Sequence, residues 1–142
     1  MNSLCAATAA IEIGAGLALL CLPSAAADLL LGAPLEAPAA STVARIGGAG
    51  LVTLGVACWL ARNDAKSPAA KGLVTAMVVY NLTVGLILAV AGVRSVPAAF
   101  VLWPVAVVLH SAMAVWCVVA VMRWKPEMPE LGSAELGLTN KS

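Results

Sequence analysis

Four long apolar runs constrain this chain more than any other feature of its sequence. They cover residues 4–23, 46–61, 72–93 and 95–122. The two central runs hold no formally charged residue, whereas the first contains Glu12 and the last contains His110. A run of about 18 or more apolar residues matches the hydrocarbon thickness of a bilayer. Because backbone polar groups find no other partner in lipid, each run is expected to be a helix.

The composition agrees with a chain that is largely embedded in lipid. Hydrophobic residues make up 62% of the 142 positions and charged residues 11%, whereas soluble domains hold about 45–50% apolar and about 25% charged residues. The predicted fold class is an all-α membrane protein, a four-transmembrane-helix bundle with a short interfacial segment between helices 1 and 2. Four spans fill residues 1–124 and leave too little chain for a separate soluble domain.

The predicted boundaries of the helices rest on caps and prolines. The four membrane helices are expected at residues 3–22, 41–61, 70–93 and 97–124. After the first of them, Ser24 and Gly32 would cap and stop a short helix, and prolines would keep residues 33–40 irregular. Pro104 lies inside the last predicted helix and should kink it.

The first apolar run has a second interpretation, as a cleaved signal peptide. Residues 24–27, Ser-Ala-Ala-Ala, resemble a cleavage site after an apolar segment. However, no Lys or Arg precedes the run, and Glu12 interrupts it. We therefore expect a retained helix that ends at Pro23.

Basic residues give the spans a direction. The loop 62–71 carries three Lys or Arg residues and the C-terminal side carries another three, whereas the opposite side carries only Arg45 and Arg94. The positive-inside rule then places both termini in the cytoplasm. The tail 125–142 combines prolines and charges without an apolar period, so it is predicted to be a disordered cytoplasmic tail.

Small residues recur at four-residue spacing in the first helix and gather in the second. Helix backbones approach each other closely in lipid where side chains are small. The first helix is therefore predicted to pack through Ala6, Ala10, Gly14 and Ala18. The second helix contains Gly47, Gly48, Gly50 and Gly55.

Polar residues interrupt the spans near their centres. Glu12, Asn81 and His110 each fall within about one turn of a helix midpoint, Tyr80 is adjacent, and Arg45 lies nearer the outer end of its helix. A charged group at the bilayer centre costs at least about 2.5–3.5 kcal/mol. Glu12 is thus expected to pair, with Arg45 and His110 as rival partners. The layer would either bind a ligand or relay a proton, or hold helices together through hydrogen bonds averaging about 0.6 kcal/mol.

No motif in the sequence indicates an enzyme. A nucleophile elbow, a phosphate-binding loop and an H-E-x-x-H motif are all missing from it. The single histidine would supply only one haem ligand, and the four cysteines form no C-x-x-C pair. No catalytic residue, cofactor or metal is therefore predicted, and the cysteines are interpreted as small buried apolar residues.

Two stretches carry a resemblance to a known family. One is residues 14–20, which follow Glu12 and run on to Pro23, and the other is the glycine-rich stretch 44–51 with its continuation to Arg62. This pattern resembles small four-helix membrane proteins of the DoxX-like kind. The resemblance implies a four-helix bundle in the bacterial inner (plasma) membrane and, in some relatives, association with redox or thiol-stress partners.

Two functions follow as expectations. The DoxX-like pattern and the small-residue surfaces favour an interaction or accessory subunit of unknown process, which would form a homo-oligomer or bind a membrane-protein partner. Small multidrug transporters also have four short helices and an essential Glu in the middle of the first, where Glu12 stands here. The alternative is therefore a small proton-coupled transporter that uses Glu12, although this chain has few aromatic residues to line a substrate site.

Overall fold

The computed structural model describes residues 1–64, 66–94 and 102–125. In this part of the chain the secondary structure is entirely helical, which confirms the predicted fold class. The helices are α1 (Asn2–Cys21), α2 (Pro23–Leu31), α3 (Pro38–Ala61), α4 (Pro68–Arg94) and α5 (Trp103–Met122). By length and composition, α1, α3, α4 and α5 are long and apolar enough to cross a membrane.

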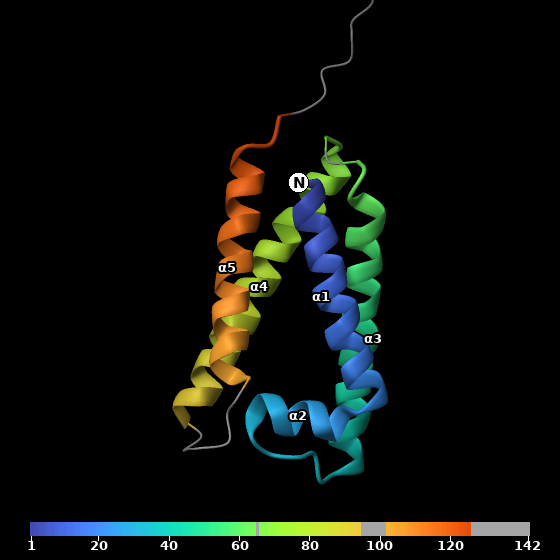
Figure 1. Ribbon diagram of the computed structural model, residues 1–142, viewed down its shortest axis with the longest axis vertical. Coiled ribbons are helices and arrows are strands. Elements are labelled where there is room, and N and C mark those ends of the chain that lie inside the picture. Colours follow the sequence, from blue (N-terminus) through green and yellow to red (C-terminus); the bar gives the residue numbers. More distant parts are fainter. Residues whose placement is uncertain (65, 95–101, 126–142) are drawn as a thin grey trace, which may run out of the picture.

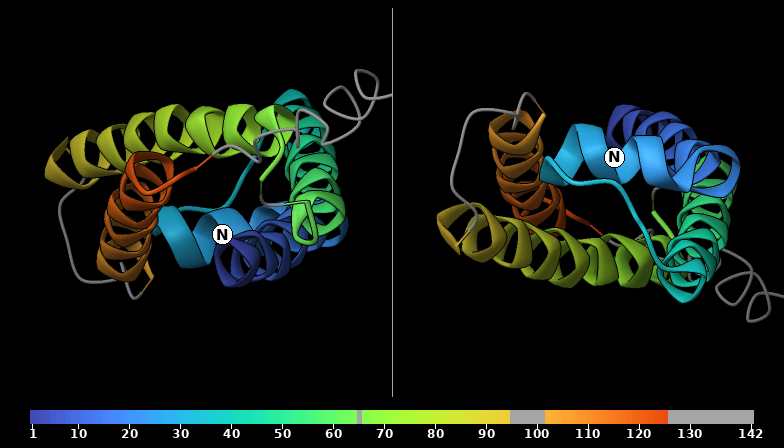
Figure 2. Two further views of the ribbon diagram at one scale, coloured as in Figure 1. Left: turned by 90° about the horizontal axis from the view of Figure 1, so that it is seen from above. Right: turned by 90° about the horizontal axis from the view of Figure 1, so that it is seen from below.

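The four long helices pack as two pairs, α1 against α3 and α4 against α5. The pairs meet at the end of the molecule that holds the N-terminus and diverge toward the opposite end, where α2 lies across the opening (Figures 1 and 2). Helix α2 contacts α1, α3 and α5 there. The two pairs and α2 thus form the three sides of a wedge-shaped backbone arrangement (Figure 1).

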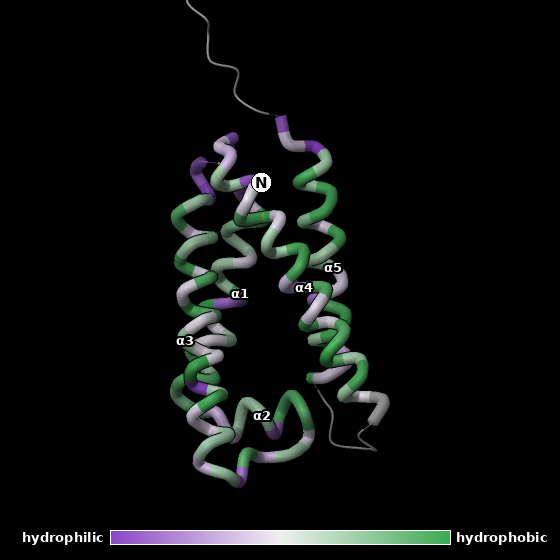
Figure 3. The backbone as a smooth tube through the Cα atoms, turned by 180° about the vertical axis from the view of Figure 1, so that it is seen from behind, coloured by the Kyte–Doolittle hydropathy of each residue, from purple (hydrophilic) through white to green (hydrophobic). Residues whose placement is uncertain are grey.

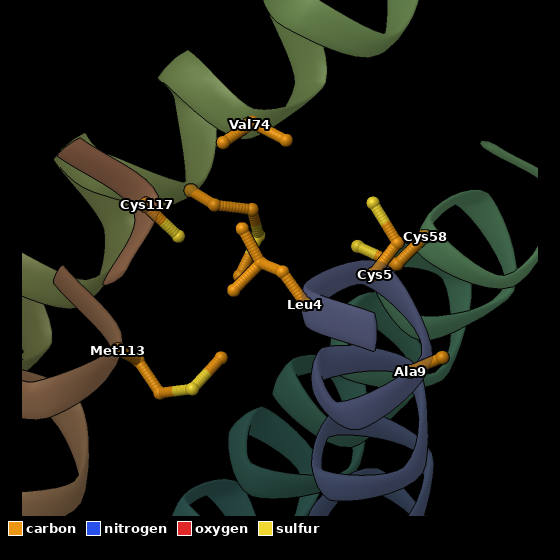
Figure 4. Packing of buried hydrophobic residues seen from close by; sticks show 8 residues of the cluster. Leu4, Cys5, Ala9, Cys58, Val74, Met113 and Cys117 are labelled. Carbon is orange, nitrogen blue, oxygen red and sulfur yellow. The ribbon is translucent and has the colours of Figure 1, made fainter. Parts of the chain in front are cut away.

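A buried cluster joins the two pairs at the converging end. It brings together Leu4, Cys5 and Ala9 of α1, Cys58 of α3, Val74 and Met77 of α4, and Met113 and Cys117 of α5 (Figure 4). The thiols of these three cysteines are buried and free, as the sequence predicted, whereas Cys21 is exposed. Many large apolar residues of the long helices are exposed, and hydrophilic residues gather at the converging end of the backbone (Figure 3). This is the pattern of a bundle that faces lipid.

Helices α1 and α3 approach closely through glycines. A Cβ placed on Gly16 would lie 2.6 Å from the carbonyl oxygen of Gly48, and one on Gly48 would lie 2.7 Å from that of Gly16. The prediction that α1 packs through Ala6, Ala10, Gly14 and Ala18 is wrong, because the helix turns a different face to α3. A Cβ on Gly14 would have no atom within 4 Å, and Ala10 and Ala18 are exposed. A helix that is apolar on every side gives no periodicity to show which face is buried.

Three of the long helices start more than one residue away from the prediction, and one of them is α4, which begins at Pro68 rather than at residue 70. Helix α3 begins at Pro38 rather than at residue 41, because proline is suited to the first turn of a helix. Helix α5 begins at Trp103, so Pro104 lies in its first turn and not in its interior, where a kink was expected. The predicted helical residues 97–101 and the tail beyond residue 125 lie outside the described residues.

The short helix α2 follows the prediction at one end and departs from it at the other. It stops at Gly32, which adopts the left-handed conformation with φ of 71° and donates its N–H to Asp28 at 2.8 Å. Ser24 does not cap the helix. Its hydroxyl instead accepts the N–H of Leu35 at 3.1 Å, which fixes the loop that leads into α3.

Candidate functional site

An apolar cavity with one polar end lies between the two helix pairs. Its volume is about 410 Å³, and its lining comes from all five helices. Thirteen lining residues are Ala, Val, Leu or Ile, and the other three are Glu12, Tyr80 and His110. We call this cavity the chamber and these three residues its polar end.

The polar and apolar parts of the chamber are separated along the bundle axis. The lining runs from Tyr80 to Leu88 on α4 and from His110 back to Leu102 on α5, about 12 Å on each helix at 1.5 Å per residue. Each of these stretches has its polar residue at the end toward the buried cluster. At the other end, Leu29 and Leu30 of α2 complete an apolar floor. The lining of the chamber is therefore complementary to an amphiphilic molecule, with one polar end and one apolar end.

Glu12 is held at the polar end by a hydrogen bond between the helix pairs. Its side chain is 5% exposed, and Oε2 accepts the hydroxyl proton of Tyr80 at 3.1 Å. The close contact of α1 with α3 at Gly16, one turn further along α1, fixes how α1 is rotated. Since Tyr80 lies on α4, this bond joins the two pairs through the middle of the apolar layer.

His110 completes the polar end from α5. Its Nδ1 lies 2.8 Å from the carbonyl oxygen of Ala106, and a carbonyl can only accept, so Nδ1 carries the proton. In the neutral imidazole Nε2 is then an acceptor. The rings of Tyr80 and His110 lie with their centroids 6.1 Å apart at an angle of 53°. Phenol, imidazole and carboxylate are thus neighbours at one depth of the bundle.

The structure brings together three of the five predicted site residues. Glu12, Tyr80 and His110 line the chamber. Asn81 is buried but uses its amide to donate to the carbonyl of Met77, in its own helix, at 2.8 Å. Arg45 is exposed on α3. Among the described residues the side-chain hydrogen bond of Glu12 is to Tyr80 rather than to either predicted partner, while His110 lies near enough to interact with the carboxyl electrostatically.

The sequence analysis missed the apolar floor of the chamber. The segment between helices 1 and 2 was predicted to be interfacial, yet its Leu29 and Leu30 line the chamber. Three consecutive leucines in a short helix signalled an apolar contact but not its direction. In the described part of the chain, no group of three or more His, Cys, Asp or Glu side chains is placed to hold a metal ion.

Comparisons with protein-family models, curated proteins and solved structures found no match to this chain. The chamber is therefore the feature from which a function is best inferred.

Proposed function

We propose that this multi-pass membrane protein binds a small amphiphilic molecule in the chamber. The observation that carries the proposal is the chamber's construction, in which Glu12, Tyr80 and His110 converge at one end of an apolar cavity of about 410 Å³. Ligand sites typically measure about 300–1,000 Å³ and combine apolar walls with a few placed polar groups. The size and the polarity of the chamber both fall in this class.

The position of the carboxyl group supports binding over simple packing. Ionisable residues within a membrane are costly, and they commonly mark substrate or ion pathways when they face a cavity. A carboxyl that served only to join helices would be expected to bury both of its oxygens against another helix. Glu12 bonds Tyr80 through one oxygen and also lines the chamber.

A pair of alanine substitutions on α1 tests the proposal. Both alanines are exposed, but Ala15 lines the chamber and Ala10 does not. The full-length protein and its Ala15→Phe and Ala10→Phe variants are titrated in phosphatidylcholine nanodiscs with decylamine, decanol and decanoate, and empty nanodiscs give the background. At least one probe should bind saturably to the wild type and to Ala10→Phe, and none to Ala15→Phe. Equal binding by both variants would contradict the proposal.

Proton-coupled transport is a second candidate, and the placement of Glu12 on the chamber favours it. A carboxyl that exchanges a proton for a substrate must face the substrate site, and Glu12 does. Reconstitution into proteoliposomes tests this role. Proton-driven uptake of a probe that binds the chamber should be lost in Glu12→Gln, and unchanged uptake would exclude Glu12 from the mechanism.

We further infer that the chain lies in the bacterial inner membrane with both termini in the cytoplasm, in line with its DoxX-like pattern. Basic residues at the converging end support this orientation. Arg62 stacks on Trp59 at 3.7 Å from the ring centroid, and Lys71 lies 4.6 Å from that of Trp124. Reporter fusions after Lys66 and at the C-terminus should both be cytoplasmic. A periplasmic signal from the first would reverse the orientation.

A role as an accessory subunit is compatible with ligand binding and concerns the outer surface. Gly47 and Gly50 of α3 have no atom within 4 Å of an added Cβ, so a second helix could approach α3 closely there. Purification in mild detergent tests this role. Recovery of a strictly monomeric protein without a partner would count against it.

A further inference from the structure

The polar end of the chamber presents hydrogen-bond acceptors to a ligand. The hydroxyl proton of Tyr80 is used on Glu12, which leaves the lone pairs of the phenolic oxygen. The Nδ1 proton of His110 is used on the carbonyl of Ala106, which leaves Nε2 as an acceptor in the neutral ring. An ionised Glu12 contributes acceptors only. Three acceptors from three helices therefore meet at one place, and the donors among these side chains are already engaged.

The charge of the polar end also favours a ligand that carries hydrogen-bond donors. Of the described residues, Glu12 is the only acidic one that lines the chamber, and the other titratable groups there are Tyr80 and His110. Arg45, one of the two rival partners predicted for Glu12, is exposed on α3. An ionised carboxylate in a low-dielectric site is stable only when a cation or several donors face it. A ligand with a positively charged N–H group would supply both the cation and the hydrogen-bond donors that an ionised Glu12 requires.

The apolar part of the chamber determines the length and the polarity of the remainder of the ligand. From the polar end the walls continue for about 12 Å along α4 and α5, and among the described residues the rest of the lining, including Leu29 and Leu30 of α2, is apolar. This length suits a medium alkyl chain or a small fused-ring body. Because the floor at Leu29 and Leu30 is apolar, the ligand would have a polar group at one end only.

We propose that the chamber binds a protonated lipophilic amine, whose nitrogen donates to Glu12, Tyr80 and His110 and whose apolar body extends toward α2. The proposal rests on the proposed function and specifies its ligand class. A carboxylate ligand would be repelled by the negative charge of Glu12. A ligand whose polar group is a carbonyl would bring an acceptor to a site that already presents acceptors.

Three probes with one tail separate this proposal from the one it rests on. Decylamine, decanol and decanoate are titrated against the full-length protein in phosphatidylcholine nanodiscs. Decylamine should bind at least about tenfold tighter than decanol, because hydrogen bonds to charged groups contribute about 1.5–3 kcal/mol and tenfold equals about 1.4 kcal/mol. Glu12→Gln should remove this preference and leave decanol binding within about threefold.

Thr8→Val serves as the matched control. Thr8 lies on α1 one turn before Glu12 and is equally buried, but it does not line the chamber. This variant should bind all three probes as the wild type does. If decylamine and decanol bind the wild type equally, or decanoate binds tightest, the amine assignment is overturned and the proposed function stands. If none of the three binds the wild type saturably, the proposed function itself fails. The comparison of probes on the wild type decides the matter even if Glu12→Gln does not fold.

Discussion

The contact between α1 and α3 can be tested with a single methyl group. A Cβ on Gly16 would lie 2.6 Å from the carbonyl oxygen of Gly48 and 2.8 Å from the backbone nitrogen of Val52. Ordinary contact begins near 3.4 Å, so Gly16→Ala requires the helices to separate by 3.4 − 2.6, or about 0.8 Å. Backbone atoms cannot rotate away as a side chain would, so the whole interface must adjust.

This separation should lower stability measurably. A gap of about 0.5–1 Å forfeits a quarter to a half of the dispersion attraction at a contact, and overpacking in general costs about 1–3 kcal/mol. For a chain of this size each kcal/mol corresponds to about 2–4 °C in the midpoint of thermal unfolding. Gly16→Ala is therefore expected to unfold roughly 2–12 °C below the wild type.

Gly14→Ala is the control, because it adds the same methyl group two residues away in the same helix. Nothing lies within 4 Å of a Cβ at Gly14, so only helix propensity changes, and that change favours alanine. Thermal unfolding of both variants in one mild detergent, followed by circular dichroism, should rank Gly14→Ala at or above the wild type and Gly16→Ala below it. Equal midpoints for the two variants would refute the close approach of α1 and α3.

Two other contacts make predictions of similar size. Tyr80→Phe removes the donor to Glu12 and should cost about 0.6 kcal/mol, the average for side-chain hydrogen bonds in membrane bundles, and at most about 1.7 kcal/mol. A double-mutant cycle with Glu12→Gln measures it, and purely additive effects would show that the bond contributes nothing. Gly92→Ala places a methyl group on the indole of Trp103, which packs against this glycine and donates to the carbonyl of Leu88. It should shift the fluorescence of Trp103 and lower the unfolding midpoint, and an unchanged spectrum would contradict this packing.

Hydropathy and local signals made the number of spans and one helix end predictable. Four apolar runs became four long helices, because length and composition are sufficient for a helix in lipid. Gly32 ended α2 as predicted, since only glycine readily adopts its left-handed conformation. The depth of the polar groups was also predictable in part, because a fixed rise per residue places Glu12, Tyr80 and His110 near one level.

Rotation of the helices about their axes was not predictable from the sequence. In water the apolar face of a helix marks the buried side, whereas these helices are apolar on every side. The four-residue spacing of small residues therefore selected Gly14 for the packing face, although it is Gly16 that meets another backbone. For the same reason Asn81 and Tyr80, adjacent in the sequence, could not be assigned to different surroundings, yet only Tyr80 lines the chamber.

The most direct test of ligand binding in the chamber is to locate a bound amine by photolabelling. Decylamine with a diazirine at the far end of its chain is bound to the protein in nanodiscs and irradiated, and the labelled residues are found by mass spectrometry of peptides. With the nitrogen at Glu12, the label should fall on Leu29, Leu30 or Leu88 at the α2 end of the chamber, and Ala15→Phe should abolish it. Label confined to outward residues such as Ile46, which is 68% exposed, and insensitive to Ala15→Phe would contradict binding in the chamber.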